Sequence, residues 1–207
     1  MSVAKLKKIF YVFEDEVQDA LQLVRNVENL VGTLSASSPK LSQTDLNKIT
    51  ELSFIKLFLA WEKFLQNALL GCIMFKRQNT KFCCYIRPKD TEHALDILKE
   101  GREYADFSNI NFVLRIANNY FRNGKPFREE LNLCRSDLDD IKTIRNVIVH
   151  ISDKSKENFK ALVRRQLGTA TRGTSPGKFL LTMAPGGTTF LTSYSNTLKD
   201  VANRIIF

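Results

Sequence analysis

The chain has 207 residues, of which 43% are hydrophobic, and its 31 Lys and Arg outnumber 22 Asp and Glu to give a net charge of +9. The length suits a single domain over residues 1–207, and an apolar content that includes 15 Phe excludes a disordered chain. No apolar run approaches the roughly 18 residues that span a bilayer, and no signal-like stretch develops near the N-terminus. We therefore expect a cytoplasmic protein with no membrane partner.

Helices are predicted along most of the chain. Apolar residues spaced by three and four predict a long helix that ends near residue 31 and a second one from Ser42 or Thr44 to about residue 75. Because the polar connection between them is short, we expect an antiparallel helix pair. The core helices cover residues 3–167. The shorter ones are predicted over 90–100, 109–120, 136–150 with Ser136 as N-cap, and 155–167.

The composition changes after residue 167. Glycines and prolines cluster over 168–189, and strand-like pieces at 178–182 and 188–192 predict a small loop or β-hairpin. A last helix over 193–206 closes the chain. The predicted fold class is therefore all-α, with a Gly/Pro-rich excursion at 168–192.

The positive charge is concentrated in two windows that contain no acidic residue. Residues 76–89 hold five Lys and Arg, and residues 107–128 hold four, so that the rest of the chain is neutral. This distribution favours an anionic partner, either a nucleic acid or an acidic protein.

The cysteines predict little chemistry. None of them has the Cys-x-x-Cys spacing of a zinc site, and the chain has only two histidines. We expect reduced, partly buried thiols, no metal and no cofactor. The four residues are Cys72, Cys83, Cys84 and Cys134.

The most informative residues lie near the end of the helix predicted over 136–150. Asn146 and His150 are four residues apart and share a helix face, with Arg145 beside them. Imidazole moves protons near neutral pH, guanidinium binds phosphate through two hydrogen bonds, and a carboxamide orients either group. The set suits phosphodiester cleavage. In the alternative interpretation, His150 caps the helix C-terminus and Arg145 pairs with an acid.

The order Arg145-Asn146-x-x-x-His150 resembles the R-N-x-x-x-H motif of HEPN-domain ribonucleases, helical-bundle proteins of prokaryotic toxin–antitoxin and antiviral systems. The resemblance covers roughly residues 1–206 and is strongest over 52–70 and 136–181. It implies a HEPN-like bundle. The segments that carry it besides the motif are 58–65 (FLAWEKFL), 159–168 (FKALVRRQLG) and 175–181 (SPGKFLL).

The resemblance implies a metal-independent endoribonuclease in which a ribose 2′-OH attacks the adjacent phosphate. Proton transfer would fall to His150, stabilisation of the charged phosphate to Arg145, and orientation to Asn146. It also implies a homodimer whose two motifs face each other across an RNA cleft. Two alternatives stay open: a non-catalytic HEPN-like module that binds RNA, a nucleotide or a protein, and, less favoured, a basic DNA-binding protein.

Two residues are candidates for supporting roles. Glu62 follows the inward-facing Trp61 and is expected near the edge of the core, where it would orient Arg145 or His150. Lys142 lies one turn before Asn146, within reach of a phosphate. In the alternative interpretation, Glu62 is an ordinary surface carboxylate and Lys142 is a solvated lysine.

The loop predicted over 76–89 interleaves cations with aromatic residues, the combination that binds single-stranded RNA. In the second window, Phe112 and Tyr120 fall on an inward helix face and are expected in the core. In the alternative interpretation, the positive charges of the loop keep the protein soluble or contact an acidic antitoxin. The candidate RNA-binding residues are Lys76, Arg77, Lys81, Phe82, Tyr85 and Arg87.

Overall fold

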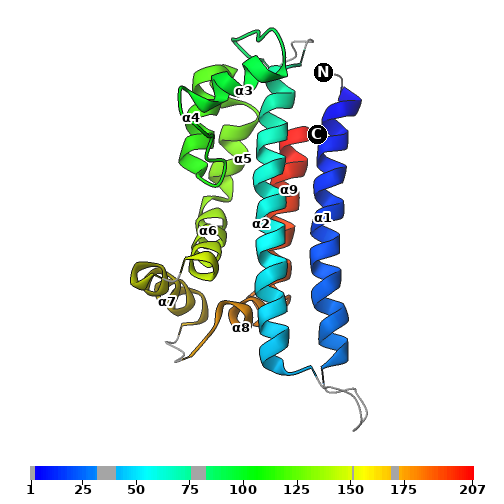
Figure 1. The fold of residues 1–207 in the computed structure, drawn as a ribbon, viewed down its shortest axis with the longest axis vertical. Coiled ribbons are helices and arrows are strands. Elements are labelled where there is room, and N and C mark those ends of the chain that lie inside the picture. Colours follow the sequence, from blue (N-terminus) through cyan, green and yellow to red (C-terminus); the bar gives the residue numbers. More distant parts are fainter. Residues whose placement is uncertain (1–2, 32–40, 76–82, 151, 169–172) are drawn as a thin grey trace. The chain divides into compact units, whose positions relative to one another are not determined.

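The computed structural model of the chain describes residues 3–31, 41–75, 83–150, 152–168 and 173–207 (Figure 1). Over these residues it has nine α-helices, one short 3-10 helix and no strand, so the predicted all-α class is confirmed. None of the described helices is long and apolar enough to cross a membrane. The α-helices are α1 (Val3–Leu30), α2 (Gln43–Ile73), α3 (Thr91–Lys99), α4 (Ile110–Tyr120), α5 (Phe127–Leu133), α6 (Arg135–Val149), α7 (Asp153–Leu167), α8 (Pro176–Leu181) and α9 (Phe190–Ile206).

The described chain packs into two compact units, and α1, α2, α6 and α9 contribute residues to both. The expectation of one domain stays a prediction. The first unit consists of Met1–Glu14, Ala60–Leu138 and Leu198–Phe207. The second unit consists of Asp15–Leu59 and Asp139–Thr197.

The two long helices pair in an antiparallel sense within each unit. In the first unit the ring of Phe13 lies 5.8 Å from that of Trp61. In the second unit the ammonium of Lys56 lies 3.5 Å from the carboxylate of Glu16. The start of α2 has the predicted cap, since the Ser42 hydroxyl accepts a hydrogen bond from the backbone of Asp45 and donates to its carboxylate. These hydrogen bonds hold the pKa of Asp45 below its ordinary value.

The first unit has a core of aromatic side chains. Trp61 and Phe64 stack with their ring centroids 5.5 Å apart, and Phe121 packs on Phe127. The segment at Cys84 joins this core through an isolated antiparallel bridge to Phe121. The sequence did not predict α5, whose seven residues fall between the predicted helices.

The segment after residue 173 corrects the strand prediction. Residues 178–181, which we expected in a strand, belong to α8, because Ser175 caps a helix whose first residue is Pro176. A single bridge between Met183 and Thr189 follows, and α9 begins at Phe190, three residues earlier than expected. The predicted turn therefore exists, but it connects two helices.

Two other helix starts differ from the prediction by one or two residues. The helix expected to be capped by Ser136 begins at Arg135. The helix expected from residue 155 begins at Asp153, with Ser152 as its N-cap. Neither difference changes which helix carries Arg145, Asn146 and His150.

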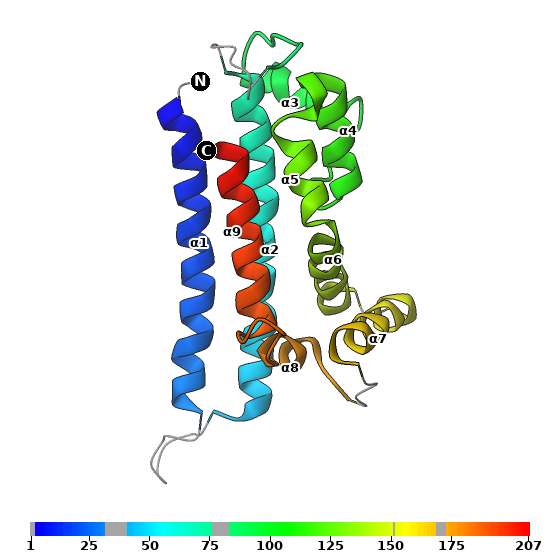
Figure 2. The same cartoon turned by 180° about the vertical axis from the view of Figure 1, so that it is seen from behind.

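A glycine brings α8 against α2 within the second unit (Figure 1 and Figure 2). The backbone N–H of Gly177 donates to the carboxylate of Glu51 at 2.8 Å. A Cβ at this position would lie 2.1 Å from the backbone oxygen of Asn47. Only glycine therefore allows this approach of the two backbones.

Gly177→Ala is expected to destabilise the protein by roughly 2–3 kcal/mol, because the added methyl group meets backbone atoms that cannot turn away. The free energy of unfolding measured in urea would show it. Gly186→Ala is the matched control, because a Cβ there meets no atom within 4 Å, and it should change stability by less than about 1 kcal/mol. Equal effects of the two substitutions would contradict the close contact.

Candidate functional site

The three motif residues lie at the C-terminal end of α6, in the second unit. Arg145 and Asn146 are in its last turns, and His150 follows its final residue. The backbone N–H of His150 donates to the carbonyl of Asn146 at 2.8 Å, which continues the helical hydrogen bonding by one residue. The imidazole is exposed, whereas the other two side chains are half-buried.

The guanidinium of Arg145 contacts both of the other motif residues. Its Nη1 lies 3.2 Å from Oδ1 of Asn146 and 3.0 Å from Nε2 of His150. Guanidinium only donates, so Nε2 accepts and carries no proton in this arrangement. The group also lies 5.6 Å from the ring centroid of Phe58, which stabilises its positive charge. Arg145 has no ion pair with any described residue, in contrast to the alternative in which it pairs with an acid.

A serine at the start of α7 fixes the backbone of His150. The buried hydroxyl of Ser155 lies 2.5 Å from the carbonyl oxygen of His150 and 2.8 Å from that of Ser152. The Ser152 hydroxyl in turn accepts from the backbone N–H of Ser155, completing a capping box. This role was not predicted from the sequence, although the three-residue spacing of the two serines was its signal.

A buried carboxylate connects α6 with α7 and α9 inside the second unit. Asp140 is 3% exposed and accepts hydrogen bonds from Arg165, from Gln166 at 2.7 Å and from the Tyr194 hydroxyl at 3.3 Å. The hydrogen bond to Asp140 raises the pKa of Arg165 above its ordinary value. Asp140 therefore holds the motif helix, five residues before Arg145, against two other helices.

The supporting residues predicted from the sequence are both half-buried. Lys142 lies on α6 in the second unit, one turn before Asn146. Glu62 lies on α2 in the first unit. A role for Glu62 or Lys142 beside the motif stays a prediction.

Four of the six candidate RNA-binding residues, Lys76, Arg77, Lys81 and Phe82, lie outside the described residues. The other two, Tyr85 and Arg87, are exposed, as stacking and phosphate contact require. RNA contact by this loop stays a prediction.

Acids outside the second basic window partly neutralise it. Arg115 pairs with Glu100 at 2.6 Å, and Lys125 lies 3.6 Å from Glu129. Phe112 is buried, as expected, whereas Tyr120 is only half-buried. The arginines of this window without a described ion pair, Arg122 and Arg128, are exposed.

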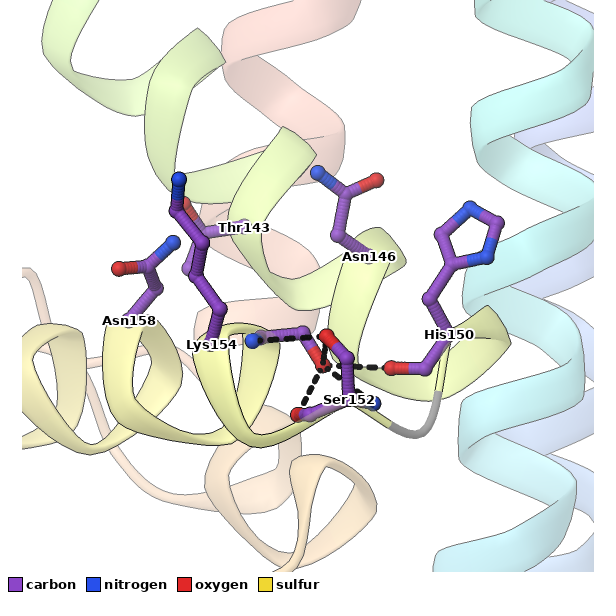
Figure 3. A pocket seen from close by; sticks show the side chains of 7 residues that line it. Thr143, Asn146, His150, Ser152, Lys154 and Asn158 are labelled. Atoms are coloured by element: carbon purple, nitrogen blue, oxygen red, sulfur yellow. Dashed lines mark hydrogen bonds between the residues drawn. The ribbon is translucent and has the colours of Figure 1, made fainter.

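A pocket of about 390 Å³ opens between the end of α6 and the first turns of α7 (Figure 3). Asn146 and His150 of the motif line this pocket. The other lining residues were not candidates from the sequence. The lining residues are Thr143, Asn146, His150, Ser152, Lys154, Ser155 and Asn158.

The four cysteines are in no disulfide, and Cys72 and Cys84 are buried. Burial raises the pKa of the Cys84 thiol, which makes it a poor nucleophile. Within the described ranges, no three or more His, Cys, Asp or Glu side chains are grouped so that they could hold a metal ion.

Comparisons with family models, with curated proteins and with solved structures find no match to this chain. The geometry of the site therefore supplies the argument for function.

Ser155→Ala is expected to lower the free energy of unfolding by about 1–2 kcal/mol, because it removes the acceptor of the Ser152 backbone N–H in the capping box and leaves the His150 carbonyl without this donor. Amide hydrogen exchange at His150 should also become faster. Ser136→Ala, at an exposed position in the first turn of α6, is the matched control and should change stability by less than about 0.5 kcal/mol. An unchanged rate of amide exchange at His150 in the Ser155 variant would contradict the role of this hydroxyl in fixing the His150 backbone.

Asp140→Asn is expected to cost about 2 kcal/mol of stability, because an amide replaces an acceptor that faces three donors. The side chain of Arg165 is 58% exposed, so the charge pair contributes less than a fully buried one would. Asp19→Asn breaks a 3.7 Å surface pair in the same unit and should cost under about 0.5 kcal/mol. Urea unfolding of both variants checks the difference, and equal losses would refute the role of Asp140.

Proposed function

We propose that this chain is a metal-independent endoribonuclease of HEPN type, acting as the toxin of a toxin–antitoxin system or as an antiviral effector. The observation that carries the proposal is the contact of Arg145 with both Asn146 and His150, at 3.2 and 3.0 Å. It gathers a proton carrier, a phosphate-binding cation and a carboxamide at one helix end, with the imidazole exposed to a substrate.

In the proposed reaction, the 2′-oxygen of a ribose forms a bond to the adjacent phosphorus while the bond from phosphorus to the 5′-oxygen breaks. His150 takes the proton of the 2′-hydroxyl and returns a proton to the leaving 5′-oxygen. Arg145 binds the phosphate oxygens, whose negative charge grows in the transition state, and Asn146 orients the guanidinium. The products are a 2′,3′-cyclic phosphate and a 5′-hydroxyl, and DNA is not a substrate because it lacks the attacking group.

The proposal includes a cytoplasmic homodimer whose two motifs face one RNA cleft, and an acidic antitoxin as its inhibitor. The exposure of Tyr85 and Arg87 supports RNA binding by the basic loop, since both are accessible to bases and phosphates. The net charge of +9 supports an anionic partner of either kind.

His150→Ala and Arg145→Ala are expected to lower cleavage of total cellular RNA by at least about a hundredfold each, since each removes a group that acts on the reacting phosphate. The assay compares wild type and variants in EDTA, with the RNA fragments resolved on a gel and their ends identified. Single-stranded DNA of the same length should stay intact.

The control is His93→Ala, which removes the other histidine of the chain, at an exposed position on α3. This variant should cleave RNA at the same rate as wild type. If wild type leaves all RNA intact, or if the His150 variant cuts as fast as wild type, the proposal fails. Binding of RNA without cleavage would instead favour the non-catalytic module.

A further inference from the structure

The pocket beside the motif has side chains from two helices and room for a small ligand. Thr143, Asn146 and His150 extend from the end of α6, and Lys154 and Asn158 extend from α7 (Figure 3). Its volume of about 390 Å³ lies within the range of roughly 300–1,000 Å³ that is usual for small-molecule sites.

The lining is cationic and rich in hydrogen-bonding groups. It contains the ammonium of Lys154 and no carboxylate. Lys154 is in no ion pair with a described residue, whereas Lys156 on the same helix lies 3.6 Å from Asp153. The pocket is therefore suited to an anion at Lys154.

Neutral polar groups surround this charge. The carboxamides of Asn146 and Asn158 each offer donors and an acceptor, as the edge of a nucleobase does. The Thr143 hydroxyl donates to the Asp139 carbonyl at 2.8 Å, which leaves its lone pairs to accept from a ligand. One negative charge next to a planar group with both donors and acceptors is the chemistry of a nucleotide.

We propose that this pocket is a nucleotide subsite, in which Lys154 binds a phosphate and Asn158 binds the edge of the base. His150 lines the same pocket, so the bound nucleotide adjoins the phosphate at which the proposed reaction takes place. The inference rests on the proposed function, and it assigns to Lys154 and Asn158 the choice of nucleotide at the cleavage position.

The experiment titrates the protein with the four nucleoside 3′-monophosphates, the four nucleosides and inorganic phosphate. Each dissociation constant is obtained from the heat of binding or from changes in NMR chemical shift. At least one nucleotide should bind more tightly than both its nucleoside and phosphate. Lys154→Ala should weaken that binding about tenfold, because it removes a charge-assisted hydrogen bond. Asn158→Ala should change the order of preference among the four bases.

The matched control is Lys160→Ala, which removes an exposed lysine of α7 that does not line the pocket. It should bind within about twofold of wild type, because surface charges at a distance are screened. The inference is overturned if phosphate binds as tightly as every nucleotide, or if the Lys154 and Asn158 variants bind like wild type.

The same variants separate this inference from the proposed function. If wild type binds nucleotides through Lys154 but cuts no RNA, the subsite stands and the ribonuclease does not. If RNA is cut in a His150-dependent way while the Lys154 and Asn158 variants bind and cut like wild type, the ribonuclease stands and the subsite is refuted.

Discussion

A carboxylate can be buried only when hydrogen-bond donors of the protein replace the water it loses. In the second unit, the carboxylate of Asp140 accepts hydrogen bonds from three donors on two other helices. Arg165 and Gln166 come from the last turns of α7, and Tyr194 comes from α9. The side chain of Asp140 therefore joins α6 to both helices. Arg145 and Asn146, five and six residues further on, take their position from it.

A second constraint acts at the start of α7, on the other side of the site. Ser155 joins the His150 carbonyl to the capping box of α7, so the backbone of His150 is held from both helices. The same first turns of α7 present Lys154 and Asn158 to the pocket. In the reaction we propose, His150 would therefore meet a substrate with its ring exposed and its backbone fixed.

Local patterns predicted most of the helices and the motif, because apolar spacing and caps such as Ser42 act over a few residues. The helix α8 was mistaken for a strand because the glycines and prolines around it are typical of loops, although Ser175 and Pro176 are a helix start. The burial of Asp140 had no local signal. Its partners lie 25, 26 and 54 residues away, and only the packed helices bring them together.

The contact between Arg145 and Nε2 of His150 makes two states of the site mutually exclusive. An imidazole nitrogen that accepts from a guanidinium cannot also hold a proton. In the proposed reaction, a proton taken up at Nε2 would end this contact, because two cations repel each other. The phosphate of the substrate would then accept hydrogen bonds from the guanidinium. Under that proposal, uptake of the proton by His150 and binding of the phosphate by Arg145 both replace the contact between the two side chains.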